Sequence, residues 1–261
     1  VFFLFSRFFQ KIIAFILAVL FVVHPIQVET AVYTSALQDV LYFFFGMIAL
    51  FLLRRGAHVL LVSGFLLLAL LSKETGALFL VAVFLFALLF AKNTIGKQIL
   101  TIAISLSGYL LLRLHVASVP FQAVDYLPIA TASLFERISS IPKMASYYIQ
   151  SFFFQKSLAI SQHWVVREMT FSDFYFPLLI VLIFLVAISI LGVWVWRTNH
   201  TQRPIFLFFS LWFLLGMLFH LQIFPLSMTV ADRWFYFPIV GLLGIIGSTA
   251  QSIYGYVRSE S

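Results

Sequence analysis

Long apolar runs separated by basic residues constrain this chain more than any other sequence feature. Inside a bilayer every backbone polar group must be satisfied within the protein, so such runs are expected to be helices. The boundaries of such runs hold to a few residues. We expect eight transmembrane helices, over residues 12–23, 33–53, 57–72, 76–91, 98–112, 175–196, 204–223 and 237–254. The sequence therefore predicts an all-α polytopic membrane protein with both termini cytoplasmic.

The composition supports this class and excludes others. The chain is 63% hydrophobic and 10% charged, with a mean hydropathy of +1.08, values typical of a polytopic membrane protein and not of a soluble domain. The net charge of +7 does not indicate a nucleic-acid partner, because the basic residues separate apolar runs instead of sharing one soluble face. The absence of cysteine excludes disulfides, thiol catalysis and thiolate metal sites.

The basic residues also predict an orientation, because cytoplasmic loops carry an excess of Lys and Arg. We place at the cytoplasmic helix ends Arg7, Lys11, Arg54, Arg55, Lys92, Lys97, Arg197, Arg203 and Arg258. Eight of the nine acidic residues then face outward, and only Glu260 does not. A carboxylate at the centre of a helix in lipid costs about 2.5–3.5 kcal/mol, so acids at outer helix ends indicate a polar outer cleft.

The chain is interpreted as a single transmembrane domain over residues 1–261, with a long outer segment at about 113–174. Within that segment residues 133–154 are amphipathic and are expected to lie in the interface or to dip into the membrane; an even number of spans favours the interface. The chain begins in an apolar run, VFFLFSRFF, which resembles the end of an earlier helix and predicts a truncated amino terminus. A signal peptide is the alternative, but HPIQVE follows in place of a small-residue cleavage site.

The first of three polar clusters at outer helix ends runs from His24 to Glu29 and is followed by Gln38 and Asp39. On a continuous helix Glu29 and Asp39 would be about 15 Å apart. They could act on one atom only if the backbone breaks between them, so we expect separate roles. His24 precedes a proline at a helix end and is interpreted as a cap or a supporting donor, in preference to a base or a metal ligand.

The second cluster is the segment SKETG, with Lys73 and Glu74 in the short connection between two apolar runs. Consecutive helical positions point about 100° apart, so at most one of the two side chains should face the cleft squarely. A solvated loop is the alternative interpretation.

The third cluster is ADRWFYFP, which contains Asp232, Arg233 and Tyr236. Pro238 disfavours helix at the residue before it and starts the last span. An Asp–Arg pair beside aromatic residues could alternatively be an interfacial anchor within an aromatic belt.

Together the segments HPIQVETAV, ALLSKETG and ADRWFYFPIVG, in this order and spacing, resemble motifs of the GT-C-fold O-mannosyltransferase-like family. That family includes the transmembrane and tetratricopeptide-repeat proteins and their bacterial relatives. The segment around Asp39, ALQDVLYFFFGMIAL, also resembles the Asp-bearing helix start of bacterial aminoarabinose and protein mannosyl transferases, in which a lysine occupies a place like that of Lys73.

The chain departs from this pattern at several points. Gln27 stands where the family often has a second histidine, and Gln38 lies in a segment that usually carries an arginine. Tetratricopeptide repeats are absent. The first helix of the family, and its first outer loop with an acidic catalytic residue, would precede Val1.

The resemblance implies a membrane glycosyltransferase of about eight helices. It would move a sugar such as mannose from a polyprenyl-phosphate donor to a hydroxyl of a protein, lipid or glycan acceptor. The reaction would take place on the extracytoplasmic face of a bacterial inner (plasma) membrane. Such a reaction needs a carboxylate to accept the acceptor's proton and cations to stabilise the departing phosphate.

The candidate residues are assigned to these roles. Asp39 and Glu29 are the acids placed nearest the sugar, and Lys73 and Arg233 are expected to contact the phosphate. Asp232 is expected to orient Arg233. His24, Glu74 and Tyr236 are expected to support these residues.

A metal ion and two further function classes are compatible with the sequence. No pair of histidines has helical metal-ligand spacing, but a hard divalent ion could be held among outer carboxylates and phosphate. A transporter or flippase of a lipid-linked substrate is a second function class, although such folds place polar residues at the midplane and these midspans are nearly free of charge. A noncatalytic membrane subunit is the third.

Overall fold

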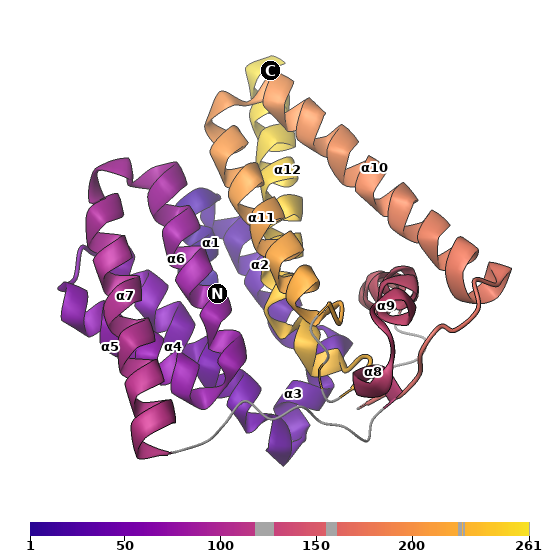
Figure 1. Cartoon of the computed structure of the whole chain (residues 1–261). Coiled ribbons are helices and arrows are strands. Elements are labelled where there is room, and N and C mark those ends of the chain that lie inside the picture. The colour runs from indigo at the N-terminus through magenta and orange to yellow at the C-terminus, as the bar shows by residue number, and fades with distance from the viewer. Residues whose placement is uncertain (118–127, 155–160, 224–225, 227, 261) are drawn as a thin grey trace.

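A computed structural model describes residues 1–117, 128–154, 161–223, 226 and 228–260, with the backbone alone for 258–260 (Figure 1). The described residues form helices and no strand, apart from one isolated bridge between Gln162 and Val230. The α-helices are α1 (Phe2–Phe8), α2 (Lys11–Val23), α3 (Val28–Val32), α4 (Leu37–Arg54), α5 (Val59–Ser72), α6 (Ala77–Phe90), α7 (Ile95–Leu111), α8 (Pro128–Thr131), α9 (Leu134–Phe153), α10 (Phe176–Thr198), α11 (Arg203–His220) and α12 (Pro238–Glu260).

Short 3₁₀ and π-helical turns lie at the ends of these helices or between them. Tight helical turns are η1 (Pro25–Gln27), η2 (Thr34–Ala36), η3 (Glu74–Gly76), η4 (Lys92–Thr94), η7 (His200–Gln202) and η8 (Asp232–Tyr236). Wider turns are η5 (Leu112–Val116) and η6 (Phe171–Tyr175). The turns extend several helices and place polar residues at their ends.

Five helical segments in the described part of the chain are long and apolar enough to cross a membrane. They are Thr34–Arg54, Lys92–Val116, Phe171–Thr198, His200–His220 and Asp232–Val257. A sixth candidate is the pair Lys11–Val23 and Pro25–Val32, which is bent by 52°. The helices Val59–Ser72 and Glu74–Phe90 are apolar but shorter. The prediction of an all-α membrane protein is therefore confirmed. Helices occupy all eight predicted runs, but in the described part of the chain only five segments, or six with the bent pair, are long and apolar enough to span, so the count of eight stays a prediction.

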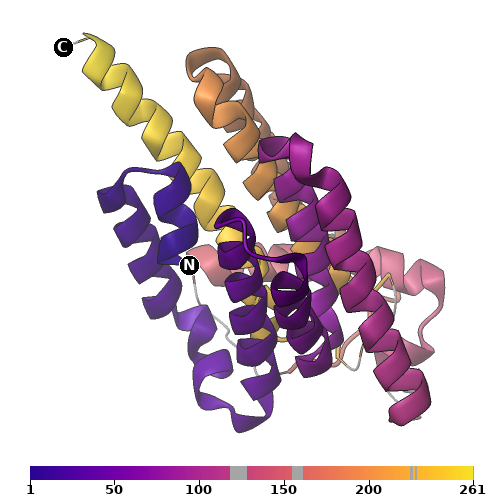
Figure 2. The same cartoon turned by 90° about the vertical axis from the view of Figure 1, so that its left-hand side faces the viewer.

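The helices form an uneven bundle (Figures 1 and 2). Helix α12 is the most enclosed candidate span, with 67% of its apolar window buried, and it packs against α11 and α2. Helix α10 is the opposite case, because only 6% of its window is buried and it leans away from the other spans (Figure 1). With a mean hydropathy of 3.1, α10 presents most of its surface to lipid.

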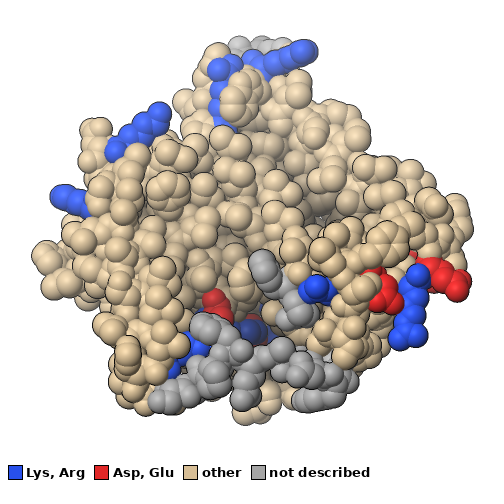
Figure 3. Space-filling view, viewed as in Figure 1, with Lys and Arg blue, Asp and Glu red and all other residues tan. Residues whose placement is uncertain are grey.

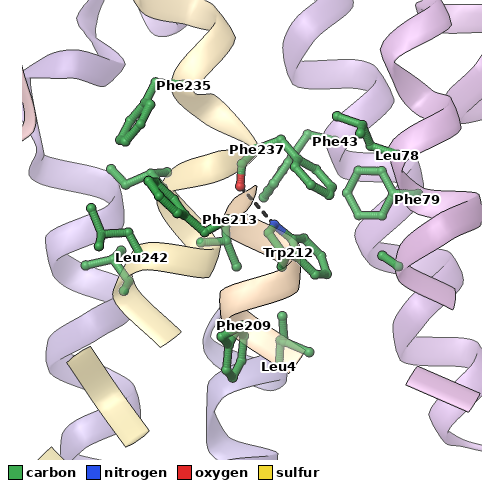
Figure 4. Close-up of a cluster of buried hydrophobic side chains, with 14 of the residues drawn as sticks. Leu4, Phe43, Leu78, Phe79, Phe209, Trp212, Phe213, Phe235, Phe237 and Leu242 are labelled. Atoms are coloured by element: carbon green, nitrogen blue, oxygen red, sulfur yellow. Dashed lines mark hydrogen bonds between the residues drawn. The ribbon is translucent and has the colours of Figure 1, made fainter. Parts of the chain in front are cut away.

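Aromatic side chains fill the space between α4, α6, α11 and the start of α12 (Figure 4). The Trp212 ring stacks on Phe237 with centroids 4.5 Å apart, and its indole N–H donates to the Phe237 carbonyl over 2.9 Å. Phe79 meets both rings edge to face. Gly46 makes room for Phe79, because a Cβ there would lie 2.2 Å from that ring. Part of the phenylalanine content thus fills the space between helices.

The amphipathic segment predicted at 133–154 is the helix α9. It begins with a capping box, in which Ser133 and Glu136 satisfy each other's backbone N–H groups. Figure 1 views α9 end-on, whereas the neighbouring spans run in the plane of the picture, so α9 lies across them. Its apolar and small residues pack against α10 and the segment before η8, where the Tyr148 hydroxyl donates to the Ala231 carbonyl over 3.2 Å.

The contact between α11 and α12 generates a first prediction. A Cβ on Gly241 would lie 2.4 Å from the backbone nitrogen of Phe213, whereas one on Gly64 meets nothing within 4 Å. We expect Gly241→Ala to destabilise the protein by about 1–3 kcal/mol, because backbone cannot move aside as a flexible side chain can. Gly64→Ala should leave stability unchanged or slightly raised. Thermal unfolding of the two variants in one detergent checks this; equal melting temperatures would show that the helices do not approach so closely.

The charge distribution generates a second prediction, on orientation. Ser35 and Asn93 are both exposed but belong to opposite ends of the helices. Cysteine at Ser35 should react with an impermeant thiol reagent added to intact cells, while cysteine at Asn93 should react only after the membrane is opened. Because the native chain has no cysteine, each label reports one position. External labelling at Asn93 would reverse the orientation.

Candidate functional site

The site begins where the backbone breaks between α2 and α4. The His24 ring accepts a hydrogen bond from the Ile26 N–H over 3.3 Å and so caps η1. Its other nitrogen lies 3.0 Å from the Phe152 carbonyl, and its ring stacks on Phe152. This contact ties the break to α9, so His24 acts as a cap held in place by a neighbouring helix.

Four charged residues from different elements meet in one group, the charge cluster: Glu29, Asp39, Lys73 and Arg233. Glu29 lies on α3, Asp39 in the first turn of α4, Lys73 between α5 and η3, and Arg233 in η8. Their side chains are 4%, 1%, 15% and 9% exposed, respectively. Two acidic and two basic side chains are therefore largely buried as a group with no formal net charge.

The contacts within the charge cluster form a chain. The Lys73 ammonium lies 2.5 Å from Asp39 Oδ1. The Arg233 guanidinium forms an ion pair with Glu29 Oε1, and the Arg233 backbone N–H donates to Glu29 Oε2 over 2.8 Å. Arg233 Nε also lies 3.8 Å from Asp39 Oδ2. Arg233 thus joins the two acids, and Asp39 joins the two bases.

Local backbone geometry explains how Lys73 reaches the charge cluster. The residue ends α5 in extended conformation, with φ of −164° and ψ of 145°. Gly76 lets the chain turn closely after it, since a Cβ there would lie 2.5 Å from the Ala69 carbonyl oxygen. Burial lowers the pKa of the Lys73 ammonium below its ordinary value, and the neighbouring Asp39 carboxylate opposes that shift.

The structure brings together the four residues that the sequence analysis placed nearest the substrate. The break that would allow Glu29 and Asp39 to act at one place is present, because α3 and η2 intervene before α4. Both acids contact Arg233, so they lie at one place; that they have separate roles stays a prediction. They still differ, since Asp39 has its closest ionic contact with Lys73.

The remaining candidates lie around the charge cluster. Glu74 pairs with Arg113 over 2.6 Å and stays 59% exposed, whereas Lys73, in extended conformation, reaches Asp39. Asp232 accepts a hydrogen bond from the Tyr147 hydroxyl over 2.6 Å. Glu29 holds Arg233 through its backbone N–H and its guanidinium; that Asp232 also orients Arg233 stays a prediction.

Tyr236 follows Arg233 in η8 and packs against the aromatic core. Its ring meets Phe43 edge to face, with centroids 4.6 Å apart, and lies 5.2 Å from Phe21. Tyr236 also lines a hollow of about 470 Å³ formed mainly by α2, α3 and α4. We call this space the lateral hollow; the residues that matter most for it are Gln27, Thr30, Tyr33 and Tyr236.

The lateral hollow contains buried polar groups without protein partners in the described structure. Gln27 is 6% exposed and Thr30 is 3% exposed, yet neither Gln27 amide atom nor the Thr30 hydroxyl has a hydrogen bond there. Buried polar groups are nearly always paired, so these atoms are exceptions in the described structure. The Tyr33 ring connects the hollow to the charge cluster, because the Arg233 guanidinium lies 5.8 Å from its centroid.

Sequence reasoning missed most of the lateral hollow. It noted Gln27 only as a departure from a family pattern, and it assigned nothing to Thr30, Tyr33 or Tyr147. A weak signal existed, since Thr30 and Tyr33 lie between the two candidate acids Glu29 and Asp39. Nothing in the sequence shows that α9 would bring Tyr147 to Asp232.

The charges on the surface are distributed unevenly between the two ends of the bundle. In the face shown in Figure 3, Asp and Glu atoms occur only in the lower part, whereas Lys and Arg atoms occur in both upper and lower parts. No group of three or more His, Asp or Glu side chains suitable for a metal ion occurs among the described residues. The two acids of the charge cluster face cations of the protein itself.

No family model, curated protein or solved structure matches the chain.

The charge cluster generates a third prediction, on stability. Removal of one partner from a buried ion pair strands the other charge, at a cost of about 3–5 kcal/mol. We expect Glu29→Ala and Arg233→Ala each to lower thermal stability strongly, and the double variant to be less destabilised than the sum of the two. A double-mutant cycle measured by unfolding in detergent tests this coupling. Additive effects would mean that the two side chains do not interact in the folded protein.

Proposed function

We propose that this chain is a membrane glycosyltransferase that moves a sugar from a polyprenyl-phosphate donor to an acceptor hydroxyl on the extracytoplasmic face. The observation that carries the proposal is the buried charge cluster beside a hollow with unpaired polar groups. It places carboxylates, cations and free hydrogen-bonding groups close together at one end of the bundle. The sequence resemblance to the GT-C-fold O-mannosyltransferase-like family supports the same class.

The proposal includes a topology of eight spans with both termini cytoplasmic. The five long segments, the bent pair and the two shorter helices supply these spans. The short helices α5 and α6 meet at Lys73, whose long side chain can carry its charge toward a polar region while its stem stays in an apolar one. The acids in the first turns of α3 and α4 then lie at the outer end.

The two acids are assigned different chemistry. Both Glu29 oxygens contact Arg233, so Glu29 holds the guanidinium in place. Asp39 Oδ2 makes no hydrogen bond in the described structure. Asp39 is therefore the carboxylate proposed to accept the proton of the acceptor hydroxyl. As the hydroxyl oxygen bonds to the sugar's anomeric carbon, the bond from that carbon to the phosphate oxygen breaks.

The two cations would stabilise the departing polyprenyl phosphate. Arg233 can offer two N–H groups to phosphate oxygens, while Lys73 contributes a compact charge. The lateral hollow suits the sugar, because aromatic side chains with a few oriented polar groups are characteristic of small-molecule sites. Gln27 and Thr30 would supply hydrogen bonds to sugar hydroxyls by turning their buried polar atoms toward the hollow. Mannose is the sugar that the resemblance favours.

The fourth prediction tests this assignment with substitutions of Arg233 and Lys73. Loss of a charge-assisted contact of about 1.5–3 kcal/mol corresponds to a decrease of about 10- to 150-fold. We expect Arg233→Ala to show the larger loss of transfer, Lys73→Ala a smaller one, and Arg233→Lys a partial recovery because lysine lacks the fork geometry. The measurement is mannose transfer from labelled polyprenyl-phosphate mannose in membranes that contain the full chain.

Arg113→Ala is the matched control. Arg113 is an arginine just after α7, outside the charge cluster, and its partner Glu74 is exposed. Expression and melting temperature are compared for every variant, since Arg233 also stabilises the fold. If Arg233→Lys is folded and transfers at the parental rate, Arg233 is an anchor and not a phosphate ligand. If donor binds and Asp39→Asn changes no transfer, the catalytic assignment fails and a transport or scaffold role is favoured.

A further inference from the structure

A second charged feature lies at the end of the helices away from the charge cluster. A cavity of about 330 Å³ is bounded by α1, the connection from α4 to α5, α6 and the start of α7. Three basic residues line it: Arg7, Arg54 and Lys97. No Asp or Glu occurs among its described lining residues. We call this space the basic cavity.

The basic cavity is remote from the candidate glycosyltransferase site. Asp39 and Arg54 occupy opposite ends of α4, which at 1.5 Å per residue separates them by about 22 Å. Lys97 lies in the first turn of α7, whereas Arg113 and its partner Glu74 lie near the other end of that helix. The basic residues of this cavity therefore have no role in the sugar transfer proposed above.

An apolar groove continues from the basic cavity. The groove has a volume of about 350 Å³ and shares Arg7, Arg54 and Phe86 with the cavity. Its wall includes Met47 and Ile48 of α4. Phe44, which also lines it, is 55% exposed, so the groove opens on the lipid-facing side of the bundle.

Polar groups add to the basic cavity. Gln98 also lines it and is 7% exposed, which places an amide group beside the three cations. Arg54 is partly positioned by a hydrogen bond of 3.0 Å from Nη1 to the Phe3 carbonyl, and the rest of its guanidinium fork carries further donors. The cavity thus offers several donors around a space free of carboxylates.

We propose that the basic cavity binds the phosphate of an anionic phospholipid, with an acyl chain of the same molecule in the apolar groove. Charge complementarity selects the headgroup, because Arg and Lys side chains between helices at a membrane surface attract anionic lipid phosphates. The adjoining groove selects a lipid over free phosphate, since only a lipid gains from burying apolar surface there. This inference is independent of the proposed sugar transfer.

The fifth prediction tests lipid selectivity. The full chain is purified in a neutral maltoside detergent and titrated with dioleoylphosphatidylglycerol in mixed micelles. Bound lipid is counted by native mass spectrometry, and affinity is read from the rise in melting temperature. We expect phosphatidylglycerol to bind at least about fivefold more tightly than dioleoylphosphatidylcholine, which has the same chains but no net charge.

Neighbouring basic residues provide matched controls. Lys97→Gln and Arg54→Gln remove charges from the basic cavity, whereas Lys92→Gln and Arg55→Gln remove exposed charges from the same helix ends outside its lining. The first pair should each weaken phosphatidylglycerol binding by about fivefold, and the second pair should change it little. Equal losses in both pairs would show diffuse surface attraction and would overturn the proposal.

Two further measurements separate lipid from free phosphate. Met47→Trp fills the apolar groove and should weaken the binding of dioleoylphosphatidylglycerol more than that of dihexanoylphosphatidylglycerol. Leu60→Trp, at an exposed position of α5, should change the binding of both lipids by the same factor. Inorganic phosphate at the same concentration should compete poorly. If phosphate alone displaces the lipid fully, or if chain length has no effect on affinity, the groove is not part of the site and the proposal fails.

Discussion

The arrangement of this protein depends on the burial of four charges at one end of an otherwise apolar bundle. Each charge of the cluster would be costly alone in a low-dielectric environment, and each is tolerated because an opposite charge lies beside it. Since Glu29, Asp39, Lys73 and Arg233 come from four separate elements, this requirement fixes α3, the start of α4, the end of α5 and η8 relative to one another. The hydrophobic effect is non-directional, so apolar packing alone would not fix these elements relative to one another in this way.

In the proposed sugar transfer, catalysis and stability would depend on the same residues. In water-free surroundings a cation near a phosphate is effective because no solvent screens it. A neutral cluster, however, must exchange part of its internal pairing for contacts with the substrate. Asp39 is suited to this exchange, because one of its oxygens pairs with Lys73 while the other has only the more distant Arg233. Glu29, with both oxygens engaged, is suited to holding position.

The sequence was a good guide to elements and a partial guide to the site. Apolar runs and their basic ends located the helices, because period and length are local properties, and the proline after His24 indicated the break at α2. The partners of Arg233 could not be read in the same way. Glu29, whose carboxylate pairs with the guanidinium and accepts from the backbone N–H, lies more than two hundred positions away in sequence. The lateral hollow was missed for a related reason, since Gln27 and Thr30 become conspicuous only when their burial and lack of partners are known.

Helix α10 connects this site to the thickness of the bilayer. The apolar segment Phe171–Thr198 has 28 residues, or about 42 Å of helix, against a hydrocarbon core of about 30 Å. A span of that length adapts to its membrane by tilting, and α10 has little protein packing to oppose the tilt. It does pack against α9, whose Tyr147 and Tyr148 bond to Asp232 and Ala231. A change in membrane thickness that alters the tilt of α10 would therefore also shift α9. Through Tyr147 and Tyr148 that shift would reach Asp232 and Ala231, so the position of the residue beside Arg233 would depend on lipid composition.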